Sequence, residues 1–254
     1  MTEMESTSDI RVFDNLQQLA PAVADEFVAR ARRAIEHDGR FTVALSGGST
    51  PQALHADLAE RTAKDPKLLD WSRVEVFFGD ERHVPPDHPD SNFRMANETL
   101  LSKVPIPPAN VHRMRCENPD AARAAAEYDQ ELAKSFHLKT EDQLPRFDLI
   151  LLGMGPEGHT ASLFPGTPAV QELKKRVVAN WVPKLNTWRV TFTRPVINHA
   201  ECVLLMVSGG DKAAALREVM GAGSPDEYPV KYVQPTRGQL IWMLDKAAAS
   251  QLQI

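Results

Sequence analysis

The 254-residue sequence contains only two cysteines, Cys116 and Cys202, and they stand far apart. Their spacing fits neither a metal site nor a redox motif. Cys202 opens an apolar run and is expected to lie in the core. Because nothing in the cysteine usage points to an oxidising compartment, we predict a cytoplasmic protein.

Long apolar segments and basic clusters are also missing. No run approaches the ~18 apolar residues of a transmembrane helix, so a membrane partner is not expected. The opening segment MTEMESTSD is polar and acidic, unlike a signal peptide. The net charge is −5 and the lysines and arginines do not cluster, so nucleic acid is not an expected partner either.

What is present is the composition of a soluble globular domain, with 43% hydrophobic and 25% charged residues. The length suits one large α/β domain over residues 1–254, with 1–8 as a disordered tail. The alternation of segments predicts a single doubly wound, mostly parallel sheet with helices on both faces. Apolar runs predict strands over 10–13, 41–45, 73–78, 147–152, 188–193, 202–208 and 240–244. Helical spacing and caps predict helices over 16–35, 51–63, 92–101, 120–136 and 211–220.

The central stretch, residues 147–168, reads FDLILLGMGPEGHTASLFPGTP. A buried strand is followed by a glycine-rich loop in which Gly155 lets a ligand approach the backbone, and then by His159. Open α/β sheets place ligands at this end of a strand, and histidine exchanges protons near neutral pH. A short helix is expected from Thr160 to Ser162. The alternative interpretation is that His159 is only a turn residue.

The segment GMGPEG in this stretch formally matches the dinucleotide-binding pattern G-x-G-x-x-G. That pattern needs a long helix starting in the motif, whereas Pro165 interrupts this one. About 20 residues further on, the sequence has the helical-looking QELKKR instead of an acid at a strand end. We therefore predict no nucleotide cofactor.

Four polar loops each follow a predicted strand, and in a parallel sheet they would meet at one edge. They comprise Ser46–Thr50, Asp80–Arg82, Gly155–His159 and Gly209–Lys212. The charged trio Asp80-Glu81-Arg82 could alternatively be a salt-bridged strand end. Its coincidence with three other loops favours one shared pocket.

The first loop has the features of a phosphate site. Ser46, Gly47, Gly48, Ser49 and Thr50 offer backbone amides, hydroxyl groups and a helix N-terminus. The loop lacks the lysine of a P-loop, which argues against a nucleoside triphosphate. Lys212 is a second candidate phosphate ligand, and Arg189 is a weaker candidate. A plain capped helix and a solvated lysine are the alternatives.

The motifs LSGGSTP, FFGDERHVP with SNFRMANETLL, LLGMGPEGHTASLFPG and VSGGDKAAAL occur in the order found in 6-phosphogluconolactonases. The chain resembles that family over nearly its whole length. The resemblance implies a Rossmann-like fold and hydrolysis of the lactone of 6-phosphogluconate, a step of the pentose phosphate pathway, without metal or cofactor. The expected partner is this small phosphorylated sugar lactone, and the expected state is a monomer or a weak homo-oligomer.

The resemblance also implies roles for residues. His159 corresponds to the general base, Arg82 to the arginine at the reacting end of the substrate, and Lys212 with Ser46–Thr50 to the phosphate site. Asp80 matches an acid of the related sugar-phosphate enzymes. The family commonly has Asp-Gly-His where this chain has Glu157-Gly158-His159, which leaves open whether Glu157 orients the histidine.

Other functions stay in view. Glucosamine-6-phosphate deaminases of the same fold carry a glutamate five residues after the histidine, where this chain has Phe164, and an apolar ring cannot exchange protons. A sugar-phosphate sensor is expected to carry a basic helix-turn-helix, and this acidic chain shows none. Ser162 is an alternative nucleophile, but no G-x-S-x-G elbow surrounds it.

Overall fold

A computed structural model describes residues 9–253 of the chain, so the predicted tail 1–8 lies outside the described residues. Its centre is a sheet of six strands in the order β1-β9-β8-β5-β2-β3, all paired in parallel. This confirms the predicted fold class. The strands are β1 (Asp9–Phe13), β2 (Phe41–Leu45), β3 (Val74–Phe78), β5 (Leu149–Gly153), β8 (Cys202–Val207) and β9 (Gln239–Asp245).

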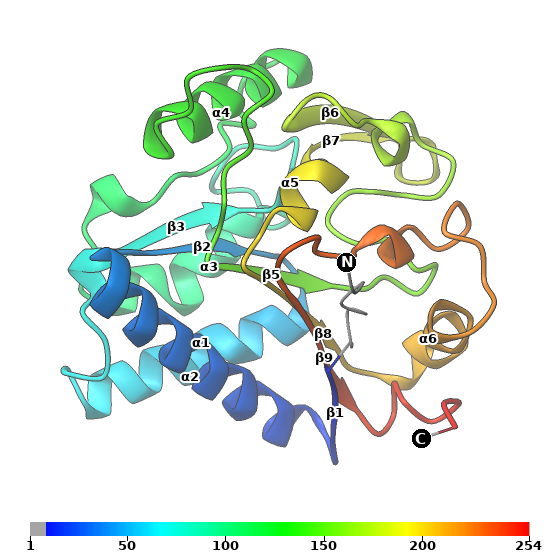
Figure 1. Ribbon diagram of the computed structural model, residues 1–254, viewed down its shortest axis with the longest axis horizontal. Coiled ribbons are helices and arrows are strands. Elements are labelled where there is room, and N and C mark those ends of the chain that lie inside the picture. Colours follow the sequence, from blue (N-terminus) through cyan, green and yellow to red (C-terminus); the bar gives the residue numbers. More distant parts are fainter. Residues whose placement is uncertain (1–8, 254) are drawn as a thin grey trace, which may run out of the picture.

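Helices cover both faces of this sheet (Figure 1). On one face lie α1 (Leu16–Asp38), α2 (Ser49–Lys64) and α3 (Asn92–Thr99), and on the other α4 (Ala121–Ser135), α5 (Arg194–Asn198) and α6 (Ala213–Met220). None of these helices is both long and apolar enough to span a membrane, as far as the described residues go.

Successive strand residues point to opposite faces and so feed two separate cores. In β8, Cys202, Leu204 and Met206 pack towards α1 and α2. Val203, Leu205 and Val207 pack towards α6 on the other side. The continuous apolar runs of the sequence are therefore strands buried on both faces, as parallel strands require.

The structure adds a second sheet that the sequence analysis did not predict. It is antiparallel and has the order β4-β7-β6, formed by β4 (Asp80–Arg82), β7 (Thr187–Phe192) and β6 (Val177–Val182). The predicted strand 188–193 belongs to this sheet, not to the parallel one. Its alternation of polar and apolar residues suits an antiparallel strand with one solvated face. Gly79 separates β4 from β3.

Two local expectations were wrong, and a third, the helix over 211–220, was right except for its first turn. Thr160–Ser162 is not helical, because the Thr160 hydroxyl group donates to the carbonyl of Gly153 (2.8 Å) and Ala161 has a φ of 46°. QELKKR forms no α-helix, and only a 3₁₀ turn over Pro168–Gln171 precedes it. The helix predicted from 211 begins with a 3₁₀ turn and becomes α-helical at Ala213.

The loop before α4 covers the outer edge of β3, the last strand of the parallel sheet. The Asn110 side-chain amide donates to the carbonyls of Ser72 and Val74, each at 3.0 Å. The backbone amide of His112 donates to the carbonyl of Val76 at 2.8 Å. Backbone acceptors along this edge are thus satisfied within the chain.

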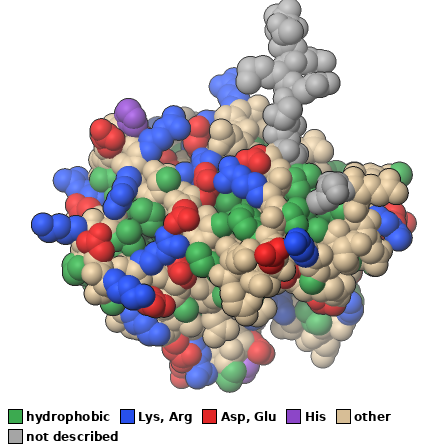
Figure 2. All heavy atoms as spheres, turned by 90° about the horizontal axis from the view of Figure 1, so that it is seen from below, with side chains coloured by type: hydrophobic (Ala, Val, Ile, Leu, Met, Phe, Trp, Pro, Cys, Tyr) green, Lys and Arg blue, Asp and Glu red, His purple; other side chains and the backbone are tan. Residues whose placement is uncertain are grey.

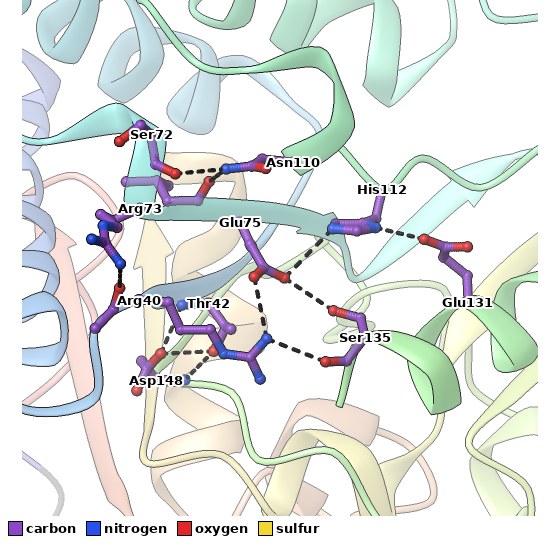
Figure 3. A network of polar contacts seen from close by, with 12 residues as sticks. Arg40, Thr42, Ser72, Arg73, Glu75, Asn110, His112, Glu131, Ser135 and Asp148 are labelled. Carbon is purple, nitrogen blue, oxygen red and sulfur yellow. Dashed lines mark hydrogen bonds and ion pairs between the residues drawn. The ribbon is translucent and has the colours of Figure 1, made fainter. Parts of the chain in front are cut away.

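A polar network continues from this edge to α4 (Figure 3). The carboxylate of Glu75 on β3 lies close to Nε2 of His112, to the hydroxyl group of Ser135 and to the guanidinium group of Arg40. Nδ1 of His112 lies 2.7 Å from a carboxylate oxygen of Glu131. The His112 contact, with Ser135 and Arg40, outweighs burial and lowers the pKa of Glu75 to about 2. The network ties β3 to α4. Elsewhere, on the face shown in Figure 2, acidic and basic side chains are interspersed.

Candidate active site

One cavity of about 260 Å³ brings together all four predicted loops. The loops meet because they follow β8, β5, β2 and β3, which are neighbours in the parallel sheet. The wall includes Ser46, Gly47, Gly48, Ser49, Thr50, Asp80, Arg82, Gly155, His159 and Lys212. A larger cavity of about 750 Å³ lies between α3 and α4 and contains none of these residues. The smaller cavity is therefore the candidate active site.

The imidazole of His159 faces this cavity from a mostly buried position, with 24% of its side chain exposed. Its ring stacks on Phe164, with centroids 4.0 Å apart and planes inclined by 20°. Nδ1 lies 3.1 Å from a carboxylate oxygen of Glu157, whose second oxygen is 3.0 Å from Nζ of Lys184. The contact with Glu157 is electrostatic, since neither atom forms a well-aligned hydrogen bond within the described residues.

These surroundings keep the imidazole neutral and the carboxyl group ionised. Burial lowers the pKa of His159 below its ordinary value and outweighs the opposing charges of Glu157 and Asp80. Burial alone would raise the pKa of Glu157, but Lys184 and His159 bring it below the usual range. In a neutral imidazole, an anion beside Nδ1 favours the tautomer with the proton on Nδ1, which leaves Nε2 available as a base.

Two glycines of this loop make room for aromatic rings, Gly155 for His159 and Gly158 for Tyr228. A Cβ atom at Gly155 would lie 2.0 Å from Cε1 and 2.1 Å from Nδ1 of His159. Gly158 has a φ of 74°, and a Cβ there would lie 2.6 Å from the ring of Tyr228. The GMGPEG segment is thus shaped to seat an imidazole, and its match to a dinucleotide motif is coincidental.

The first loop presents an uncapped helix N-terminus to the cavity. Gly48 precedes α2 with a φ of 111° and provides no side-chain cap, and the first turn of α2 contains no acidic residue. Amides of a first helical turn have no intrahelical acceptor. The hydroxyl oxygen of Ser46 is buried and has no hydrogen-bond partner among the described residues. Unsatisfied donors at a helix N-terminus suit an anion.

The fourth loop is held by a residue that the sequence analysis missed. Asp245, at the end of β9, accepts hydrogen bonds from the Ser208 hydroxyl group at 2.5 Å and from the amide of Gly209 at 3.1 Å. This carboxylate fixes the turn that delivers Lys212 to the cavity. Lys212 contacts only Asp211 (2.8 Å) among the carboxylates of the described residues. In the sequence, the signal for this role of Asp245 was its place as a single acidic residue at the end of an apolar strand.

The three charges of the second loop have different tasks. Glu81 is buried and accepts from the backbone amides of Asn92 (2.7 Å) and Phe93 (2.8 Å), so it caps α3. Asp80 lines the cavity and accepts from the hydroxyl group of Ser162 at 2.6 Å. Arg82 reaches the cavity and donates to the carbonyl of Asp90 at 2.5 Å.

Asn92 is a further member of the cavity wall that the sequence analysis did not single out. Its side-chain nitrogen donates to the carbonyl oxygen of Asp80 at 2.9 Å and to its carboxylate at 3.2 Å. The motif SNFRMANETLL contained this residue, but no spacing rule distinguishes it from a helix cap.

Arg189 is the one predicted site residue that the structure does not bring to the cavity. It lies on β7 directly opposite Arg82 of β4. Burial and then the neighbouring Arg82 lower the pKa of its guanidinium group. The phosphate site considered below does not include it. In residues 9–253, no cluster of three or more histidine, cysteine or carboxylate side chains is arranged to hold a metal ion.

Comparison with known proteins gives a consistent result. The sequence pattern of the glucosamine-6-phosphate isomerases/6-phosphogluconolactonase family matches residues 14–242. A 6-phosphogluconolactonase from Nostoc sp. is 39% identical, with 96% of this chain and 98% of the relative aligned. One from Synechocystis sp. is 43% identical over 88% of this chain and 90% of the relative.

Solved structures agree. The 6-phosphogluconolactonase from Trypanosoma cruzi superposes with a TM-score of 0.84 at 31% identity, covering both chains completely. A monomeric glucosamine-6-phosphate deaminase has a TM-score of 0.79 at 18% identity over 96% of this chain and 99% of its own, and shows the shared fold alone. The resemblance seen in the four motifs is confirmed, and the chain belongs to the glucosamine-6-phosphate isomerase/6-phosphogluconolactonase family, within which it groups with the 6-phosphogluconolactonases.

Proposed function

We propose that this protein hydrolyses 6-phosphoglucono-1,5-lactone to 6-phosphogluconate with His159 as general base. The observation that carries the proposal is the convergence of a neutral imidazole, an uncapped helix N-terminus and a lysine on one cavity. The names of the relatives support the same substrate. The direct test is to generate the lactone in solution and compare its loss with the spontaneous rate at mildly acidic pH.

In the proposed mechanism the substrate phosphate binds the N-terminus of α2 and Lys212. Nε2 of His159 removes a proton from a water molecule as its oxygen bonds to the lactone carbonyl carbon. Negative charge develops on the carbonyl oxygen, where Arg82 or loop amides stabilise it, and such donors are worth about 3–4 kcal/mol each. The bond from this carbon to the ring oxygen then breaks, and the imidazolium returns the proton to the ring oxygen.

Deamination of glucosamine 6-phosphate is the alternative reaction. The stacking of Phe164 on His159 opposes it, because this side chain holds an apolar ring against the base and cannot exchange protons. Release of ammonia from glucosamine 6-phosphate would favour the alternative. Binding of the phosphosugar without turnover would instead favour a sensor.

Replacing Lys212 with alanine should weaken binding of the phosphorylated lactone while leaving the non-phosphorylated lactone unaffected. Loss of a charge-assisted hydrogen bond predicts a rise in KM of about 10- to 100-fold. Steady-state kinetics with both lactones measure this difference, and Lys175→Ala, an exposed lysine outside the cavity, serves as control. An equal effect of Lys212→Ala on both lactones would exclude the phosphate role.

Replacing Glu157 with glutamine should move the acidic limb of kcat/KM to lower pH. The negative charge of Glu157 raises the pKa of His159, so its removal lowers that pKa further and leaves a weaker base. The pH profile of kcat/KM reports the change in the free enzyme, with the exposed Glu141→Gln as control. A limb that stays in place or moves to higher pH contradicts the assignment of Glu157 as the partner of His159.

A further inference from the structure

The side-chain amide of Asn92 has a fixed orientation. Its nitrogen lies within hydrogen-bond distance of two acceptors, the carbonyl oxygen and the carboxylate of Asp80. Acceptors cannot satisfy an amide oxygen, so the nitrogen must face Asp80. The amide oxygen, Oδ1, therefore points the other way.

Oδ1 of Asn92 lies against the turn that follows β2. A Cβ atom at Gly47 would come within 1.8 Å of it, so only glycine fits beneath this oxygen. Asn92 and Gly47 both line the cavity, and Asn92 is 2% exposed. No donor among the described residues bonds Oδ1. Oδ1 is not among the fully buried oxygens that lack a partner, so it keeps access to the cavity, where a ligand can supply the donor.

The surroundings define which ligand group fits. The carboxylate of Asp80 lies beside the same amide, so an anionic phosphate is repelled there, whereas a neutral hydroxyl group can donate a hydrogen bond. The phosphate is assigned to the amides of the α2 N-terminus and to Lys212, whereas Asn92 and Asp80 present acceptor oxygens to the same cavity.

We propose that Asn92 is a specificity-determining residue whose Oδ1 accepts a hydrogen bond from one hydroxyl group of the sugar ring. This inference rests on the proposed lactonase function. The same residue couples two loops, since its nitrogen holds Asp80 while its oxygen meets both Gly47 and the substrate. A site that binds a hydroxyl group in this way rejects the analogue that lacks it, because the buried acceptor is then left unpaired.

The test combines enzyme variants with deoxy substrates. The kcat/KM of the wild-type protein and of Asn92→Ala is measured with 6-phosphogluconolactone and with its 2-, 3- and 4-deoxy analogues. Asn97→Ala, an exposed asparagine on the same helix, is the matched control. For the full substrate, Asn92→Ala should lower kcat/KM by about 3- to 10-fold, the usual range for one neutral hydrogen bond. For one deoxy analogue this penalty should vanish.

The possible outcomes distinguish a failure of the role inferred for Asn92 from a failure of the proposed lactonase function. If Asn92→Ala loses the same factor on every lactone, Asn92 is only structural and the inference is wrong. If the wild-type protein turns over none of the lactones above the spontaneous rate, the proposed function fails instead.

A second variant, Asn92→Asp, keeps the size of the side chain and guards against misfolding of the alanine form. It places two carboxyl groups side by side, so one of their pKa values must rise. Its kcat/KM should therefore decline as pH increases through that raised pKa. A pH profile identical to that of the wild type would also overturn the placement of Asn92 against Asp80.

Discussion

Replacing His159 with alanine should lower lactone hydrolysis by roughly 10²- to 10⁴-fold, the usual contribution of a general base. The fold should survive, because the ring stacks on Phe164 at the border of the cavity and belongs to neither hydrophobic core. Turnover is measured on freshly generated lactone, corrected for spontaneous opening.

The control for this prediction is His88→Ala, an exposed histidine outside the cavity. Its turnover should match that of the wild type. Circular dichroism and the melting temperature of both variants separate lost chemistry from lost structure. Near-normal turnover by His159→Ala would remove the residue from the mechanism.

Replacing Gly155 with alanine should have an effect approaching that of removing the base, a loss of about 10²-fold or more. The added methyl group would overlap the imidazole, only 2.0 Å from Cε1, so the ring must leave its position. Gly79→Ala is the matched control, since a Cβ at Gly79 would meet its nearest neighbour at an ordinary 3.7 Å.

A double variant distinguishes this cause from general damage to the loop. If Gly155→Ala acts through His159, then adding it to His159→Ala should cost little further activity. Multiplying losses in the double variant would show that Gly155 serves the substrate or the fold by another route. Both predictions concern the imidazole of His159, which one variant removes and the other displaces.

The sequence predicted the parallel sheet well because its strands are buried on both faces. Runs such as LILLG and CVLLMV contain no polar residues at regular spacing. Glycines at or just after their ends indicate where the strands stop. Once the order of strands and loops was known, the meeting of the four loops followed from parallel topology alone. The positions of His159, Lys212 and the Ser46–Thr50 turn could therefore be anticipated.

The second sheet could not be anticipated in the same way. Its strand β4 has three residues, all charged, and its pairing with β7 spans more than 100 positions of the chain. Local patterns carry no information on such contacts. The same limit hid Asn92, whose importance lies in its contacts with Asp80 and Gly47 and not in its neighbours in sequence.

Arg189 shows that a strand can be predicted correctly while the surroundings of its side chains depend on the pairing partner. The strand exists, but it pairs with β4, so Arg189 faces a like charge and lies outside the cavity wall. At Glu157, where the family commonly has aspartate, the structure keeps a carboxylate beside the histidine. The longer side chain still reaches Nδ1 of His159 with one oxygen, while its other oxygen pairs with Lys184.

The coverage of β3 has a consequence for how copies of this protein can associate. An open strand edge offers a template on which a second molecule can add its own strand, the first step towards swapped dimers and fibrils. At β3 the side chain of Asn110 and the backbone of His112 already occupy that template. A strand from a second molecule would first have to displace these contacts before it could pair with β3.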